Sequence, residues 1–84
     1  MIHILYFASL REALGLASEQ VNLPTEVGTV GALVSWLHLR GESWTKQLSP
    51  GKRWRVSVNH EMAGPGSAVK AGDEVAFFPP VTGG

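Results

Sequence analysis

The sequence contains no cysteine. Disulfides, thiolate nucleophiles and thiolate metal sites are therefore excluded, because each needs a cysteine sulfur. No apolar run approaches the roughly 20 residues that a membrane-spanning helix needs. Residues 1–15 also lack the basic start and the small-residue cleavage site of a signal peptide. We therefore expect a soluble protein of the cytoplasm with no membrane partner.

Neither sign of charge is in excess. Seven Lys and Arg residues balance seven Asp and Glu residues. Without a basic face, non-specific binding to nucleic acid or to an anionic membrane surface is not expected. The chain is 44% hydrophobic and 17% charged, a balance that suits a folded domain rather than a disordered one. Its 84 residues fit a single domain.

Residues that could carry chemistry inside the domain are few. His3, His38 and His60 are scattered and have no ligand partners at metal-binding spacing, so we predict no metal site. Neither GxxxxGK[ST] nor GxGxxG is present, and no serine has an evident base and orienting acid. The tryptophans are expected at the core or its edge, with a binding surface as the alternative. They are Trp36, Trp44 and Trp54.

The N-terminal stretch predicts a strand followed by a short helix. Residues 2–8 are short and rich in β-branched and aromatic side chains, which favours a strand. Alternate side chains of this strand point to opposite faces. The polar residue His3 suggests that its face is the more solvent-exposed one and that the other face points inward. Residues 9–15 read as a helix with Ser9 as N-cap, Glu12 at capping-box spacing and Gly15 as its stop. The inward face would hold Ile2, Ile4 and Tyr6, and the wetter face His3, Leu5 and Phe7.

Residues 29–41 give the clearest helical pattern in the chain. Thr29 can cap the helix and Gly41 can end it. Apolar residues recur at helical spacing and predict an inward stripe. The stripe consists of Val30, Leu33, Val34 and Leu37.

Three further strands are predicted, at residues 18–24, 55–59 and 74–78. The segment 43–54 mixes a helical turn with an "SPG" turn, and residues 63–74 are rich in turn residues. About four strands and one long helix indicate an α+β domain, with a sheet packed on that helix. Alternation places Val56, Val58, Val75 and Phe77 on inward faces, and Arg55, Ser57, Asn59, Ala76 and Phe78 on the opposite ones.

The sequence ends in "FFPPVTGG". Pro79 and Pro80 lack backbone N–H groups, so the last strand cannot continue its ladder past Phe78. The prolines favour an extended chain, and Gly83 and Gly84 lack Cβ atoms and can pass through a narrow channel. We therefore predict a domain of residues 1–78 and a flexible, extended tail of residues 79–84 that carries a free carboxylate on Gly84.

A carboxylate is a poor electrophile and must be activated before it reacts, for example as an acyl-adenylate. A sulfur nucleophile would then give a thiocarboxylate, and a lysine amine would give an amide. Another protein must catalyse either acyl transfer, because this chain has neither a phosphate loop nor a thiol.

The stretch "DEVAFFPPVTGG" resembles the C-terminus of the small, sulfur-carrier subunits of molybdopterin synthase, which are ubiquitin-like sulfur carriers. The stretches "ILYFASLREALG" and "VSVNHEM" also match that family in place and spacing. The resemblance runs almost from end to end and is weakest over residues 16–54. It implies a ubiquitin-like β-grasp fold, with a mixed sheet of about four to five strands packed on one long helix.

The resemblance also implies a reaction cycle. A ubiquitin-activating-like adenylyltransferase would use ATP and Mg²⁺ to adenylate Gly84, and a sulfur-relay protein would convert it to the thiocarboxylate. The tail would then enter a pocket of the large synthase subunit, within a heterotetramer, and pass sulfur to precursor Z (cyclic pyranopterin monophosphate). Two such transfers make the dithiolene of molybdopterin. This chain would be a sulfur donor with no bound cofactor and no active site of its own.

The matching positions imply a docking surface for these partners. Phe7, Arg11, Met62 and Phe78 correspond to partner-contacting positions of the family, although the two phenylalanines could instead be ordinary core residues. Residues 43–54 and His60 depart from the family pattern. The tail contacts would be made by Pro79, Pro80, Val81 and Thr82, with Gly83 giving access to the partner's pocket.

Three alternative functions stay open. The first is a sulfur carrier for thiazole or amino-acid biosynthesis, which "FPPV" before the two glycines disfavours. The second is a ubiquitin-like modifier that is joined to lysine through Gly84. The third is a plain interaction domain with an inert tail.

Overall fold

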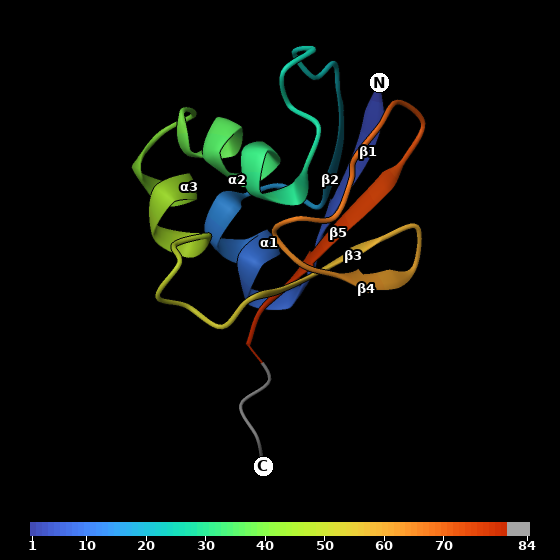
Figure 1. Cartoon of the computed structure of the whole chain (residues 1–84). Coiled ribbons are helices and arrows are strands. Elements are labelled where there is room, and N and C mark those ends of the chain that lie inside the picture. The colour runs from blue at the N-terminus through green and yellow to red at the C-terminus, as the bar shows by residue number, and fades with distance from the viewer. Residues whose placement is uncertain (81–84) are drawn as a thin grey trace.

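A computed structural model of the chain describes residues 1–80. These residues form one five-stranded sheet in the order β2-β1-β5-β3-β4. The helices gather on one side of the sheet (Figure 1). The predicted α+β class is therefore confirmed. The elements in chain order are β1 (Ile2–Tyr6), α1 (Ala8–Leu14), β2 (Ser18–Val21), α2 (Val30–His38), α3 (Glu42–Gln47), β3 (Arg55–Val58), β4 (Glu61–Ala63) and β5 (Glu74–Phe78).

The two strands at the centre of the sheet come from opposite ends of the chain. β1 and β5 run parallel, with Ile4 opposite Val75 and Tyr6 opposite Phe77. All other strand pairs are antiparallel: β2 flanks β1, β3 flanks β5, and β4 is the outer neighbour of β3. The sheet is thus mixed, and the chain leaves it from a central strand (Figure 1).

The core lies between the sheet and the helices. The predicted inward residues of β1 are buried, as are Val75 and Phe77 of β5. The predicted stripe of α2 is also fully inward, with exposed fractions of 0–7%. Thr29 caps α2 as predicted, because its Oγ1 accepts a hydrogen bond of 3.1 Å from the Ala32 N–H.

Two predicted helix ends were wrong. Ser9 does not cap α1, which begins at Ala8 with Phe7 as the N-cap residue and no side-chain cap. The reason is that Phe7 is still extended and donates to the Phe77 carbonyl, so the sheet runs to the first residue of the helix. Gly41 does not end α2, which stops at His38. Gly41 instead takes φ 144° and is the N-cap residue of α3. Gly15 does end α1 in the left-handed region, as expected.

The sequence analysis missed β4. Asn59 and His60 both take positive φ, 51° and 70°, which is the requirement of a two-residue hairpin turn between antiparallel strands. The turn pairs β3 with a three-residue strand inside the segment that was expected to be loop. Ser57 lies on the outward face, as predicted. It is nevertheless only 7% exposed, and it pairs with Met62 of β4.

A small polar cluster holds this hairpin to β5. The Asn59 side-chain amide donates to Asp73 at 2.9 Å and accepts from the Glu74 N–H at 3.0 Å. The Lys70 N–H donates to the other oxygen of Asp73. The Asn59 hydrogen bond, with the Lys70 N–H second, lowers the pKa of the Asp73 carboxyl.

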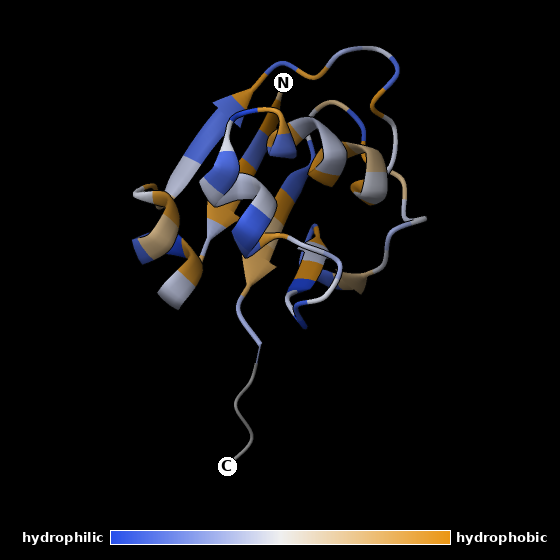
Figure 2. Cartoon of the chain, turned by 90° about the vertical axis from the view of Figure 1, so that its left-hand side faces the viewer, coloured by the Kyte–Doolittle hydropathy of each residue, from blue (hydrophilic) through white to orange (hydrophobic). Residues whose placement is uncertain are grey.

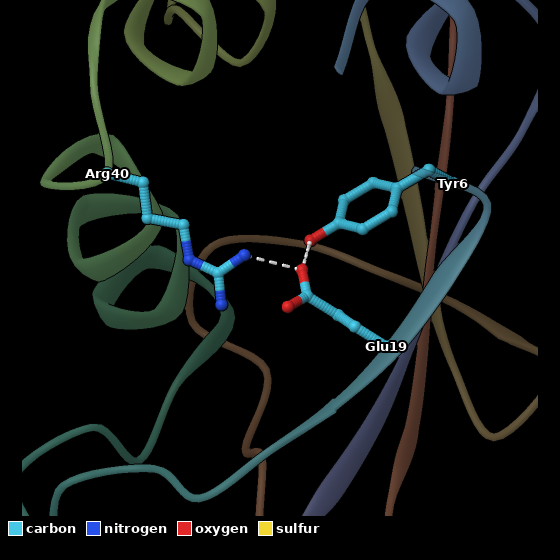
Figure 3. Close-up of polar contacts among 3 residues, drawn as sticks. All are labelled: Tyr6, Glu19 and Arg40. Carbon is cyan, nitrogen blue, oxygen red and sulfur yellow. Dashed lines mark hydrogen bonds and ion pairs between the residues drawn. The ribbon is translucent and has the colours of Figure 1, made fainter. Parts of the chain in front are cut away.

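A second polar cluster joins the sheet to the end of α2 (Figure 3). The buried Tyr6 hydroxyl donates to Glu19 at 2.8 Å, and Arg40 donates to the same carboxylate oxygen at 2.6 Å. Burial, followed by the Glu19 hydrogen bond, raises the pKa of Tyr6 well above its usual range. The Glu19 hydrogen bond also raises the pKa of Arg40.

The tryptophans lie at the core edge, as expected. The Arg40 guanidinium is 4.8 Å from the centre of the Trp44 ring and 5.3 Å from that of Trp36, within cation–π range. Trp44 meets Tyr6 edge-on. Trp54 meets Phe77 in the same way, with ring centroids 5.8 Å apart.

We expect Tyr6→Phe to lower the free energy of unfolding by about 1–2 kcal/mol, because it deletes a hydrogen bond to a largely buried carboxylate. Urea unfolding would measure this. In a Glu19→Leu background the same change should cost clearly less, since the acceptor is already gone. An equal cost in both backgrounds would assign the loss to packing and contradict the role of the hydrogen bond.

Asp73→Asn should lower the free energy of unfolding at neutral pH, and the loss should be smaller at acid pH. The folded pKa of Asp73 lies below the unfolded value of about 3.9. Its contribution is therefore complete above that value and is lost as the pH falls through the folded pKa. Urea titrations between about pH 7 and about pH 3 should show the gap between the two proteins shrinking. Glu26→Gln, at an exposed site, is the matched control, and a gap that stays constant with pH would refute this account.

Candidate functional site

Two aromatic rings stack on the outer face of the central strands. Tyr6 and Phe77 face the core, so the residues that follow them, Phe7 and Phe78, point to the opposite side. The rings of Phe7 and Phe78 lie 4.9 Å apart at an angle of 4°. Phe7 is 40% exposed and Phe78 is half-buried. The predicted outward position is confirmed, and the core alternative is wrong for this pair. Partner binding stays a prediction.

The strand register continues this surface across the sheet. One row of paired positions runs from Leu5 through Ala76 and Ser57 to Met62. Met62 is 64% exposed at the far end, whereas the small Ala76 and Ser57 between the larger side chains are almost covered. We call Leu5, Phe7, Met62, Ala76 and Phe78 the open face. It is an apolar strip opposite the helices, of the kind that marks a protein–protein interface.

Arg11 lies beside the open face rather than on it. It is exposed on α1, one helical turn after Phe7, and its N–H contacts the Phe7 carbonyl at 3.5 Å. Within residues 1–80, Arg11 forms no ion pair. Contact of Arg11 with a partner stays a prediction.

The tail begins at the end of β5. The ladder stops at Phe78 as predicted, Pro79 is half-buried and Pro80 is exposed. Figure 2 shows the hydrophobic end of β5 passing directly into the less hydrophobic proline segment. The remaining predicted tail residues, Val81, Thr82, Gly83 and Gly84, lie outside the described residues.

Residues 1–80 contain no group of three or more His, Asp or Glu side chains placed to hold a metal ion. None of the helices described there has both the length and the apolar character to cross a membrane. The histidines have other surroundings: a ring nitrogen of His38 is 3.0 Å from the Leu48 carbonyl oxygen, and His60 is exposed 3.7 Å from Glu74. The predicted site residues within residues 1–80 lie on the open face, on α1 beside Phe7, and at the tail root.

Comparison with known proteins decides the family. The family model described as "ThiS family" matches residues 4–84. The chain belongs to the ThiS family. Two curated members named molybdopterin synthase sulfur carrier subunit, from Haemophilus influenzae and Escherichia coli, are 40% and 38% identical to it. Both matches span 84 residues and cover 100% of each chain.

Solved structures confirm the fold. The crystal structure of small archaeal modifier protein 1 from Haloferax volcanii has a TM-score of 0.79 and 29% identity, and the match covers 95% of this chain and 97% of that chain. The ThiS-family chain therefore has the expected ubiquitin-like β-grasp fold, with five strands. Leu5 and Ala76 of the open face were not recognised as part of a site. The alternation of inward and outward side chains along each strand was visible in the sequence. The register that places these residues side by side across the sheet was not.

We expect Phe7→Ala to lower the free energy of unfolding by about 0.5–1.5 kcal/mol, the range for one exposed aromatic pair. Phe77→Ala, one residue before the partner ring and fully buried, should cost about 3–5 kcal/mol. Urea unfolding of the two variants would measure the difference. If Phe7→Ala were as costly as Phe77→Ala, Phe7 would belong to the core, and the open face would lose its principal aromatic.

Proposed function

We propose that this chain is the sulfur carrier subunit of a molybdopterin synthase. Adenylation joins the Gly84 carboxylate to the phosphorus of AMP and releases pyrophosphate. Hydrosulfide from the sulfur donor then attacks the Gly84 carbonyl carbon and AMP leaves, which gives the thiocarboxylate. The thiocarboxylate sulfur then bonds to precursor Z, and water cleaves the bond between that sulfur and the Gly84 carbonyl carbon, which restores the carboxylate. The observation that supports this most strongly is the match, over the full length of this chain, to two proteins of that name.

The described structure supplies a reason for the location of the reacting group. A stretch of six residues, 79–84, spans at most roughly 20 Å when fully extended. Its root lies beside Phe78, at one end of the open face. A partner that covers the stacked rings therefore stands within reach of the carboxylate, and docking would raise its effective concentration in the partner's active site.

The proposed partners supply the catalysis. An adenylyltransferase would provide ATP and Mg²⁺, a sulfur-relay protein the sulfur, and the large synthase subunit the pocket for precursor Z, within a heterotetramer. In this scheme Phe7, Met62 and Phe78 make the apolar contact, and Arg11 pairs with a carboxylate of the partner. The chain itself donates sulfur and performs no catalysis.

A second candidate is a protein modifier. It is favoured by the likeness to a protein that is named as an archaeal modifier. In that case a lysine amine attacks the same Gly84 adenylate, AMP leaves, and an amide forms. A sulfur carrier for another pathway would share the thiocarboxylate and differ only in the acceptor.

Intact mass spectrometry tests the proposal directly. After incubation with ATP, the activating enzyme and a sulfur donor, the chain should gain the mass difference between one sulfur and one oxygen. Deleting Gly84, or adding one residue after it, should abolish this gain and leave the unfolding midpoint unchanged, because changes at a chain terminus generally remove little packing. One residue added before Met1 is the matched control and should leave the gain intact.

Sulfur loading of the chain with an added C-terminal residue would refute the proposal, since the reacting group would then not be the Gly84 carboxylate. Lysine-linked conjugates without a thiocarboxylate would support the modifier instead.

A further inference from the structure

A groove lies on the helix side of the sheet, between α2 and the β3–β4 hairpin. Its volume is about 660 Å³, within the range of ligand-binding clefts. Its buried lining is aliphatic and includes Val30, Val34, Leu48 and Val56. The groove opens where β4 stops, because β4 pairs with β3 only from Val56 onward and leaves the preceding segment uncovered.

Hydrogen bonds fix the walls of the groove. The Trp54 indole N–H donates to the Ser49 carbonyl at 2.9 Å, and the Trp54 ring meets Phe77 edge-on. On the far side, the Gly31 N–H donates to the Pro65 carbonyl at 2.9 Å and holds that loop against α2. A groove whose walls are already ordered loses less conformational entropy when it is filled.

The charges around the groove have one sign. Residues 43–60 contain four basic residues and no acidic residue, although the whole chain is neutral. Lys52 and Arg55 of this segment line the groove and are exposed, and no acidic residue lines it. Within residues 1–80, neither cation forms an ion pair. The groove therefore combines an apolar floor with an uncompensated positive rim.

We infer that this groove binds an acidic peptide segment of a partner protein, whose apolar side chains enter the groove while its carboxylates face Lys52 and Arg55. Charge complementarity selects this occupant, because two unpaired cations beside an apolar floor favour carboxylates next to apolar side chains. Single-stranded nucleic acid is disfavoured, because the groove offers one half-buried aromatic ring, that of Trp54, rather than the successive platforms on which bases stack. The concave shape does not suit insertion into a membrane.

The groove shares Met62 with the open face and is otherwise a different surface. The open face is opposite the helices, whereas α2 forms one wall of the groove. The two surfaces approach each other at the tail root, since Arg55 pairs with Phe78 across β3 and β5. The inference holds whether or not Gly84 carries sulfur, because it concerns the described domain alone.

The test uses the full chain labelled with ¹⁵N. It is titrated with a ten-residue peptide of glutamates that contains two phenylalanines and one leucine, and with the same peptide in which glutamine replaces every glutamate. The acidic peptide should shift the amide signals of Gly31, Ser35 and Ala63 and the indole signal of Trp54. The signals of Leu5 and Phe7 should stay in place. The glutamine peptide should bind about tenfold more weakly.

Two variants and a matched control sharpen the result. The double variant Lys52→Glu/Arg55→Glu should weaken binding at least about tenfold, because it reverses the rim charge. Ser35→Trp, at an exposed position that lines the groove, should weaken it similarly by filling the space. Lys46→Glu/Lys70→Glu changes the net charge equally at exposed sites outside the groove, and its affinity should stay within about twofold.

Several outcomes would overturn the inference. These are no binding of the acidic peptide, equal binding by Lys52→Glu/Arg55→Glu, or signal shifts confined to the open face. Tighter binding of a ten-nucleotide single-stranded DNA or of phosphatidylserine vesicles would assign the basic rim to another class of partner. A dimer in sedimentation that involves the groove would assign it to a second copy of the chain.

Discussion

The parallel pairing of β1 with β5 is the constraint on which the rest of the structure depends. The register places Tyr6 opposite Phe77, and the two rings stack on the core side with centroids 5.9 Å apart. One residue later, Phe7 and Phe78 stack on the outer side at 4.9 Å. A single register therefore sets an aromatic pair in the core, an aromatic pair on the open face, and the point at which Pro79 leaves the sheet. A slip of one residue would exchange the two faces.

The small domain holds this register by packing rather than by the stability of its helices. α1 has seven residues and α3 has six, lengths that do not form stable helices in water on their own. They persist because Leu10 of α1 and Leu48, the residue that follows α3, are buried in the core. The Tyr6–Glu19–Arg40 cluster ties the end of α2 to β1 and β2. The open face and the tail root therefore sit on a rigid support, which is what a docking surface requires.

The sequence predicted the parts of this structure that are encoded locally. The periodicity of α2 and the alternation of β1 and β5 identified the inward residues, and two prolines marked the end of the ladder. Non-local pairing explains the misses. The Phe7–Phe77 hydrogen bond replaced the expected Ser9 cap, and the positive φ of Asn59 and His60 created β4. Family resemblance identified Phe7, Met62 and Phe78 of the open face, but the remaining residues of that face and the groove come from segments far apart in the chain, so the sequence alone did not unite them. The need to activate the Gly84 carboxylate followed from its chemistry, whereas the sulfur-transfer cycle came from family resemblance, and Gly84 lies beyond the described residues.

The net charge of the chain is zero, but its positive charges are unevenly distributed along the sequence. Two of the four cations of residues 43–60, Lys52 and Arg55, line the groove, and Arg55 lies beside the tail root, whereas the open face is apolar. In the proposed function, each successive partner must bind within the roughly 20 Å that six extended residues can span. Partners that both need this root must exclude each other there, even if one binds the open face and the other the groove. The order of adenylation, sulfur loading and sulfur donation would then follow from competition among the partners for the tail root. The affinity of a partner for the open face would depend on the apolar area it buries, and the affinity of a partner for the groove would depend on its charge.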